Sequence, residues 1–441
     1  MDDVTQKKRD ALSDNVAQMF PSHLARLQSL ASRVTAQNVA AMLGQHMPRL
    51  KRLYVTVDEK PVHYRGSQVI AAPELHTLYM NGISLPYYAP NLRSLRIRFR
   101  HNTQVLLSSL LDPLRSASLL ESLELQNANN EFGPMDPMLP LRVPVDLPQL
   151  ASLIFDGTSF NFKSLWKSIH IPLTESVSVE VMGRDTEVDV VRLLRPFFER
   201  PTNDTLRLFC NDDFWSRRIS MRVCASADGL IHPMAYGKAR LSGAQISAVY
   251  EQRHHEQAGD TSTRPDVFAS ALVANLIPES IRFLDLDLAL RRGTALQLSE
   301  LDSIRDALRP LVNVSAISVG RDSDMKILKE LLCPESASTT SPFPLLRTLE
   351  LKHLRDTTAC ERWWRSDFKD VLENWANLGI LCTTLLAYRR PLTRVRVSAH
   401  TLSELGGDED AYRAQERWIR GAQSWVDDLE ITDLAVKRVA A

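Results

Sequence analysis

The chain has 441 residues, of which 44% are hydrophobic and 24% charged, with 53 basic residues against 53 acidic ones. A formal net charge of zero excludes an overall electrostatic attraction to nucleic acid or to an anionic membrane. We therefore expect no nucleic-acid partner, and because no run approaches the roughly eighteen apolar residues of a membrane span, we expect no membrane partner either.

A polar segment, residues 1–20, precedes a recurring Leu-x-x-Leu-x-Leu phrase that has apolar substitutes and is often opened by proline. Clear copies start at positions 48, 73, 90, 118, 148 and 344, and weaker copies start at 25, 174, 201, 216, 279, 312 and 390. From 48 to 201 most intervals lie near the 20 to 29 residues of a leucine-rich repeat. One short strand cannot bury its apolar side alone, so the repetition predicts strands stacked in register around a shared core. The first clear copy reads Pro48-Arg49-Leu50-Lys51-Arg52-Leu53-Tyr54-Val55.

Between the phrases, apolar residues recur at three and four positions, which predicts helices at 103–116, 187–199, 299–308 and 367–388. Residues 82–89 are too few for a helix and predict a tight return loop. These elements predict an α/β fold, an irregular leucine-rich-repeat solenoid or horseshoe of about twelve repeats. Its parallel sheet would form the concave side, with helices or loops on the convex side.

The repeat-like domain is expected to cover residues 21–403, with an insertion at about 229–265 where the phrase is absent. We expect the insertion to be an exposed loop with a short helix at 242–254. Residues 404–441 carry many charges beside Tyr412, Trp418 and Trp425. That pattern predicts a charged capping helix, covering the open end of the core, and a tail.

The five cysteines are widely separated and include no Cys-x-x-Cys pair, and the polar N-terminus does not resemble a signal peptide. These features favour reduced thiols and a location in the cytoplasm or nucleus. Cys210 and Cys224 fall in or beside predicted strands, so we expect them to be packed and not nucleophilic.

In its phrases and turns the chain resembles the F-box and leucine-rich-repeat proteins of basidiomycete fungi. The strands of that family resemble Leu119-Leu120-Glu121-Ser122-Leu123-Glu124-Leu125, and its short return resembles Leu85-Pro86 followed by Ala89-Pro90-Asn91-Leu92. The resemblance covers residues 20–400 approximately. It implies an intracellular fungal protein in which an N-terminal F-box docks a ubiquitin-ligase adaptor while the repeats hold a substrate.

The sequence departs from that family at its N-terminus. Residues 1–20 contain no Leu-Pro-x-Glu-type helix start and are too few for a three-helix F-box. The nearest match, at 277–281, is better explained as the entry to a strand at 283–288. Two alternatives stay open: the F-box has been lost, or the chain is an incomplete version of a longer product. The ligase adaptor is therefore an uncertain partner.

In a leucine-rich repeat the residues between the apolar positions line the concave sheet, because strand side chains alternate between faces. Among these outward positions we expect an early cluster to bind a protein partner, since aromatic and Arg residues are the usual anchors of interfaces. The alternative is that they are ordinary solvated strand residues that pair across neighbouring strands. The cluster consists of Tyr54, Tyr79, Arg96, Arg98 and Glu124.

The chain carries no phosphate-binding loop, no Gly-x-Ser-x-Gly elbow and no His-Glu-x-x-His motif. His254-His255-Glu256 is interpreted as part of a polar loop, and Asp285 with Asp287 as the acidic exposed face of a strand. We therefore expect a protein that is not an enzyme and holds no cofactor or metal.

These features favour a protein-interaction module whose partner lies on the concave face. Its more specific function, implied by the resemblance, is substrate recognition for a cullin-type ubiquitin ligase. One alternative is a scaffold without an F-box that acts independently of ubiquitination. The other is an enzyme with an unrecognised site.

Overall fold

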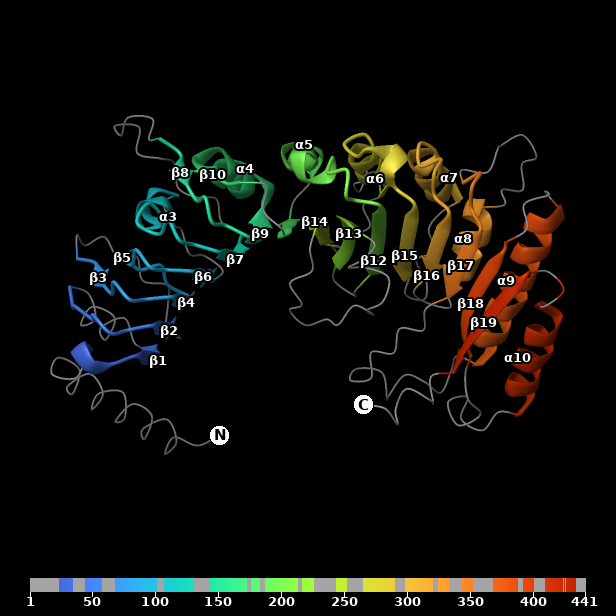
Figure 1. Ribbon diagram of the computed structural model, residues 1–441, viewed down its shortest axis with the longest axis horizontal. Helices are drawn as coiled ribbons and strands as arrows, with labels where there is room; N and C mark the ends of the chain where they lie inside the picture. Colours follow the sequence, from blue (N-terminus) through green and yellow to red (C-terminus); the bar gives the residue numbers. More distant parts are fainter. Residues whose placement is uncertain are drawn as a thin grey trace. The chain divides into compact units, whose positions relative to one another are not determined.

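The computed structural model divides into two compact units, Met1–Val190 and Val191–Ala441, and the boundary falls within helix α5 (Glu187–Phe198). Each unit is an α/β structure with helices and an open, mostly parallel sheet (Figure 1). The structure describes residues 24–34, 44–57, 68–100, 107–129, 143–172, 176–182, 187–212, 216–225, 243–251, 265–289, 298–319, 324–332, 343–351, 368–387, 392–399, 409–422, 424 and 426–433.

The described strands of the first unit form a parallel sheet in which equivalent positions of successive phrases lie side by side. Leu53 pairs with Leu78, and Leu78 with Leu95, and all three side chains are buried. The predicted inward register of the phrase is therefore confirmed here. In spatial order the strands are β1 (Ser29–Val34), β2 (Arg52–Val57), β4 (Thr77–Asn81), β6 (Ser94–Arg98), β7 (Ser122–Ala128), β9 (Ser152–Thr158) and β11 (Ser176–Met182).

A tight turn leads into each of the early strands and explains the prolines that open the phrases. The N–H of Leu75 donates to the carbonyl of Ala72 at 3.0 Å, with Pro73 between them. Proline favours the second position of such a turn because its ring fixes φ near the required value. The equivalent bonds run from Leu50 to Met47, from Leu92 to Ala89 and from Leu150 to Leu147.

A single carbonyl then fixes the register of each incoming strand. The Lys51 carbonyl accepts hydrogen bonds from the N–H groups of His76, at 2.9 Å, and Thr77, at 3.1 Å. Each carbonyl therefore satisfies two donors of the next strand, which leaves few orphaned backbone groups where the strands begin. The same arrangement recurs at the carbonyls of Gln28, His76, Arg93 and Glu121.

Short helices and two-residue strands connect the long strands of the first unit. The helix predicted at 103–116 is confirmed where the structure describes it, as α3 (Leu107–Leu114). The return at 82–89 contains no helix, as predicted, but it does contain β5 (Tyr87–Tyr88), which pairs with β3 (Ile70–Ala71). The other connecting elements are η1 (Leu24–Arg26), β8 (Val145–Asp146), α4 (Ser159–Ser168) and β10 (Ile169–His170).

The apolar side of this sheet packs against its helices. Phe155 of β9 lies with its ring centroid 5.3 Å from that of Phe162 on α4, and both side chains are fully buried. Helix α4 begins where the Thr158 hydroxyl accepts a hydrogen bond from the N–H of Asn161 at 3.2 Å. The helices thus cover one face of the strands and leave the other for polar side chains.

The register changes once in the described part of this sheet, between β7 and β9. Leu125 pairs with Phe155 but Ala128 pairs with Gly157, so β7 holds an extra residue, as in a β-bulge. Asn127 takes a left-handed φ of 56° there. A Cβ at Gly157 would meet the Ala128 carbonyl oxygen at 2.5 Å, so the close approach requires glycine.

Tyr87 on β5 provides a test of burial in this unit. Its side chain is buried, and its hydroxyl has no hydrogen-bond partner among the described residues. A buried polar group without a partner costs about 1–3 kcal/mol. We therefore expect Tyr87→Phe to raise the free energy of unfolding at neutral pH by about 1 kcal/mol, measured by urea denaturation of the full chain.

The same substitution should change the response to alkali. Burial raises the pKa of the Tyr87 phenol above its ordinary value of 10.0. Above pH 10 the unfolded chain loses this proton while the folded chain keeps it, so the stability contributed by the protonated phenol falls as the pH rises. The Phe variant should lose less stability than the native chain above pH 10, and parallel curves would contradict the burial of this phenol.

The second unit has a sheet in which one strand runs against the others. β13 pairs antiparallel with both of its neighbours, and the remaining described pairs are parallel. In spatial order the strands are β14 (Gly243–Glu251), β13 (Ser216–Cys224), β12 (Thr205–Asp212), β15 (Phe283–Ala289), β16 (Ala316–Val319), β17 (Thr348–Leu351), β18 (Arg394–Ala399) and β19 (Asp428–Asp433).

Two predictions are wrong in this sheet. The helix predicted at 242–254 is replaced over Gly243–Glu251 by β14, in which Ala244 and Ile246 are buried as alternate residues. The sheet was also predicted to be parallel throughout, but β12 and β13 are separated by a connection of only three residues. Such a short connection suits a hairpin, whereas a parallel crossover needs a dozen or more residues.

The helices of the second unit follow one another along one side of its sheet, α6 against α7, α7 against α8, α8 against α9 and α9 against α10 (Figure 1). The helices predicted at 187–199, 299–308, 367–388 and in 404–441 are confirmed. After the last of them the chain adds β19 beside β18, which the sequence did not predict. The helical elements are α5, α6 (Pro265–Val273), η3 (Pro278–Ser280), α7 (Leu298–Leu308), α8 (Asp324–Leu332), α9 (Phe368–Ala387) and α10 (Glu409–Ala422).

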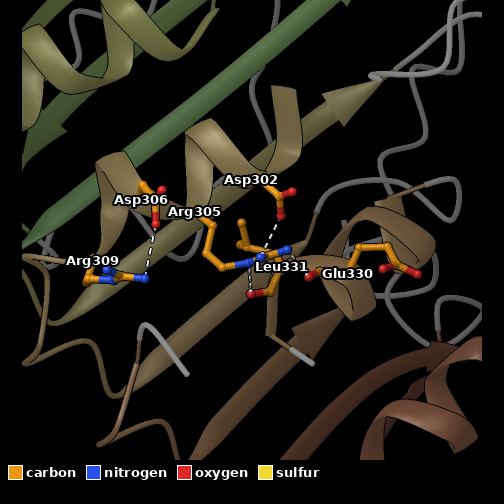
Figure 2. A network of polar contacts seen from close by, with 6 residues as sticks. All are labelled: Asp302, Arg305, Asp306, Arg309, Glu330 and Leu331. Carbon is orange, nitrogen blue, oxygen red and sulfur yellow. Dashed lines mark hydrogen bonds and ion pairs between the residues drawn. The ribbon is translucent and has the colours of Figure 1, made fainter. Parts of the chain in front are cut away.

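A buried arginine joins α7 to the end of α8. Figure 2 shows the Arg305 guanidinium between Asp302 of its own helix and the last turn of the next helix. Nη1 donates to the Asp302 carboxylate at 2.7 Å, and Nη2 donates to the Glu330 carbonyl at 2.7 Å. Nε donates to the Leu331 carbonyl at 3.3 Å. The guanidinium therefore satisfies carbonyls that lack partners within α8 because the helix ends there.

Candidate functional site

The structure brings the five predicted site residues together on one face of the first unit's sheet. Tyr54 of β2 pairs with Tyr79 of β4, Tyr79 with Arg96 of β6, and Arg96 with Glu124 of β7. Arg98 lies two residues beyond Arg96 on the same strand and therefore points to the same side. We call the outward side of β2, β4, β6 and β7 the polar face.

Tyr54, Tyr79 and Arg96 form a row across three strands. The two tyrosine rings have centroids 6.2 Å apart and are tilted by 50°. The Arg96 Cζ lies 5.4 Å from the Tyr79 ring centroid, within the range of a cation–π contact. Tyr54, at the open end of the row, is 38% exposed. The row therefore presents an aromatic edge to solvent at β2.

Arg96 is neutralised by its neighbours on β7. Its Nε lies 3.3 Å from Glu124 Oε1, and its Nη2 donates to Gln126 Oε1 at 3.2 Å. Gln126 in turn donates to Glu124 Oε1 at 2.6 Å. The Arg96 and Glu124 side chains are only 30% and 21% exposed. Arg96 and Glu124 therefore make the cross-strand pairing that was the alternative for this cluster.

Two arginines on the polar face remain open. Arg98 on β6 and Arg52 on β2 are both exposed, and neither guanidinium forms a hydrogen bond or ion pair with the part of the chain that the structure describes. The five predicted residues did not include Arg52. Its signal was present in the sequence, because it occupies an outward position of the phrase two residues before Tyr54.

On the equivalent face of the second unit, a buried ion pair links the central strands β12 and β15. Asp285 of β15 was predicted to be exposed, and this prediction is wrong: it is 4% exposed. Its Oδ2 accepts from Arg207 Nε of β12 at 2.6 Å. The two residues are direct partners in the parallel register of β12 and β15. Pairing offsets the cost of burying both charges, so this carboxylate is a structural group.

Other sequence candidates do not contribute to the polar face. Cys224 is buried, as predicted. His254, His255 and Glu256 lie outside the described residues. Within the described ranges no group of three or more His, Cys, Asp or Glu side chains could hold a metal ion. In the same ranges no helix has the length and apolar character that crossing a membrane requires.

A scan against protein-family models gives no match, and a search of curated proteins gives no significant match.

Proposed function

We propose that this chain is a protein-binding module of the leucine-rich-repeat solenoid type and that a partner binds to the polar face. The observation that supports this most directly is the row of Tyr54, Tyr79 and Arg96 beside the open guanidiniums of Arg52 and Arg98. Tyr and Arg are enriched among the residues that dominate binding energy at interfaces. Parallel strands hold these side chains on a rigid support, which lowers the entropic cost of binding.

The more specific proposal is recruitment of a substrate to a cullin-type ubiquitin ligase in the cytoplasm or nucleus. It is supported by the resemblance of the phrases and turns to fungal F-box and leucine-rich-repeat proteins. A scaffold that acts without the ligase is the alternative within the same class. Neither version assigns a catalytic residue or a cofactor to this chain.

Affinity purification with matched variants tests the proposed face. The full chain, Tyr54→Ala with Arg98→Glu, and Phe160→Ala with Lys167→Glu are expressed with a tag in a basidiomycete host, and co-purified proteins are identified by mass spectrometry. The last pair likewise removes an aromatic ring and reverses a positive charge, but at exposed positions of α4. We expect partners that the α4 variant retains and that the Tyr54→Ala, Arg98→Glu variant loses.

The identity of those partners separates the two versions. Recovery of a ligase adaptor with a cullin supports substrate recruitment, and specific partners without them support the scaffold. A set of partners that is the same for all three proteins would contradict binding at the polar face.

A further inference from the structure

The early strands carry a local excess of positive charge in a chain that is neutral overall. Residues 44–100 contain nine Lys and Arg residues against three acidic ones. In the described parts of that range, 44–57 and 68–100, the acidic residue is Glu74, which lies on a turn. In the described residues the basic excess is therefore concentrated on β2 and β6 and the segments that flank them.

The neighbouring strands limit this basic region on one side. Glu124 on β7, Asp156 on β9 and Glu180 on β11 occupy successive strands of the same sheet. The acidic residues of this side of the sheet thus begin at β7, where Glu124 is paired with Arg96. None of these three strands carries Lys or Arg, so they offer an acidic ligand no basic partner beyond β6.

The two open guanidiniums lie at opposite corners of the basic region, with the tyrosine pair between them. Arg52 is in register with Thr77 and Ser94, and Arg98 lies four residues beyond Ser94 on β6. Two strand spacings and four residues along a strand separate their Cα atoms by roughly 16 Å. An extended peptide, at about 3.3 Å per residue, covers that distance in about five residues.

We propose that the polar face binds an extended acidic segment of a partner protein, with two carboxylates about five residues apart and an apolar or aromatic residue between them. The carboxylates pair with Arg52 and Arg98, and the intervening side chain packs on Tyr54 and Tyr79. Arg96 takes no part in the charge recognition because Glu124 neutralises it, and it acts by holding the Tyr79 ring. This inference rests on the proposed function of the same face and specifies its partner.

The charge pattern favours a peptide over nucleic acid. A nucleic acid presents a regular series of phosphates, and tight binding draws on several phosphate contacts. The polar face offers two uncompensated guanidiniums and then β7, a strand without a basic residue. Guanidinium groups bind carboxylates in a bidentate geometry, so two of them suffice to position a short acidic segment.

Selection from a random twelve-residue peptide library displayed on phage tests the proposal. The targets are the full chain and the double variant Arg52→Glu with Arg98→Glu, which we call the polar-face variant. Arg282→Glu with Arg309→Glu is the matched control, because it reverses the charge of two exposed arginines in the second unit. We expect the native chain and the control to enrich peptides with Asp or Glu about five residues apart.

The most enriched peptide is then synthesised and its affinity for the three proteins measured by fluorescence anisotropy at low and high salt. We expect the polar-face variant to bind at least about tenfold more weakly, and the affinity of the native chain to fall with added salt. A single-stranded oligonucleotide is measured in parallel with each protein.

Four outcomes would overturn the inference. Enriched peptides without an acidic bias would do so while leaving the face as a protein-binding site. Acidic peptides that bind the native chain and the polar-face variant equally well would move recognition away from Arg52 and Arg98. No enrichment by the native chain would exclude an extended acidic segment as the ligand. Tighter binding of the oligonucleotide than of the peptide, lost in the polar-face variant, would assign the face to nucleic acid.

Discussion

Arg305→Ala is expected to lower the free energy of unfolding of the second unit by about 3 kcal/mol. The Arg305 side chain is only 8% exposed and donates to one carboxylate and two carbonyls (Figure 2). Its removal leaves the carbonyls of Glu330 and Leu331 without these donors where α8 ends, and it leaves a cavity between α7 and α8. Hydrogen exchange of the full chain, read from peptides covering these two helices, measures the loss.

A matched control lies just after the end of α7. Arg309 pairs with Asp306 at 3.1 Å in the same i, i+3 geometry, but both side chains are more than half exposed. An exposed pair of this kind contributes about 0–1 kcal/mol, so Arg309→Ala should have a small effect. Arg305→Lys keeps the charge but lacks the planar fork, and we expect it to recover only part of the loss. Equal effects at 305 and 309 would contradict the role of the buried guanidinium.

Leu123→Ala is expected to destabilise the first unit by about 2–5 kcal/mol. The side chain is fully buried, and its strand lies between β6 and β9, where Leu95 and Leu153 occupy the equivalent positions. Truncation therefore opens a cavity in the middle of the stacked row. The loss should appear as faster exchange of amide hydrogens in β6, β7 and β9.

The same substitution at Leu119 is the control, because Leu119 belongs to the same phrase but is 41% exposed. We expect Leu119→Ala to change stability by less than about 0.5 kcal/mol. Similar losses from the two variants would mean that the inward register of this phrase is wrong.

Much of the strand arrangement follows from the sequence because its causes are local. Every copy of the phrase, clear or weak, coincides with a strand. The alternation of apolar residues specifies which face is buried, and the proline turn specifies where the strand begins. Equivalent positions then lie side by side in parallel strands, which is why Tyr54, Tyr79 and Arg96 could be placed in one row.

The missed elements depend on partners distant in sequence. The sequence of β14 shows only a weak alternation of apolar residues, because its buried residues include Ser247 as well as Ala244 and Ile246. The Ser247 hydroxyl is hydrogen-bonded to the Ser220 hydroxyl of β13. Half of the residues of β19 are acidic, and its alternation rests on only two apolar residues, Leu429 and Ile431, in the segment assigned to the cap and tail. Its Asp428 accepts from Arg394 of β18 at 2.7 Å, a contact that appears only once the strands are paired.

The charges of the candidate site also depend on partners that the sequence pattern does not show. The phrase places Arg96 and Arg98 on the same face but does not distinguish them. Arg96 is neutralised because Glu124 lies beside it on β7, whereas the partner of Arg98 in the register is Gln126, which carries no charge. The burial of Asp285 likewise depends on Arg207, 78 residues earlier in the chain. Side-chain pairing across strands, not residue type alone, decides which charges stay open.

A shared carbonyl sets the register where each early strand begins, so the register of the strands does not depend on the length of the return segment between them. Successive phrases are 17 residues apart between positions 73 and 90 and 30 apart between 118 and 148, yet both intervals lead to strands whose first residues lie in matching register. The difference in loop-closure cost between such lengths is only about 0.5 kcal/mol. Insertions and deletions in the return segments should therefore accumulate during evolution at little cost. A single inserted residue within a strand would reverse its faces, so such changes should be rare.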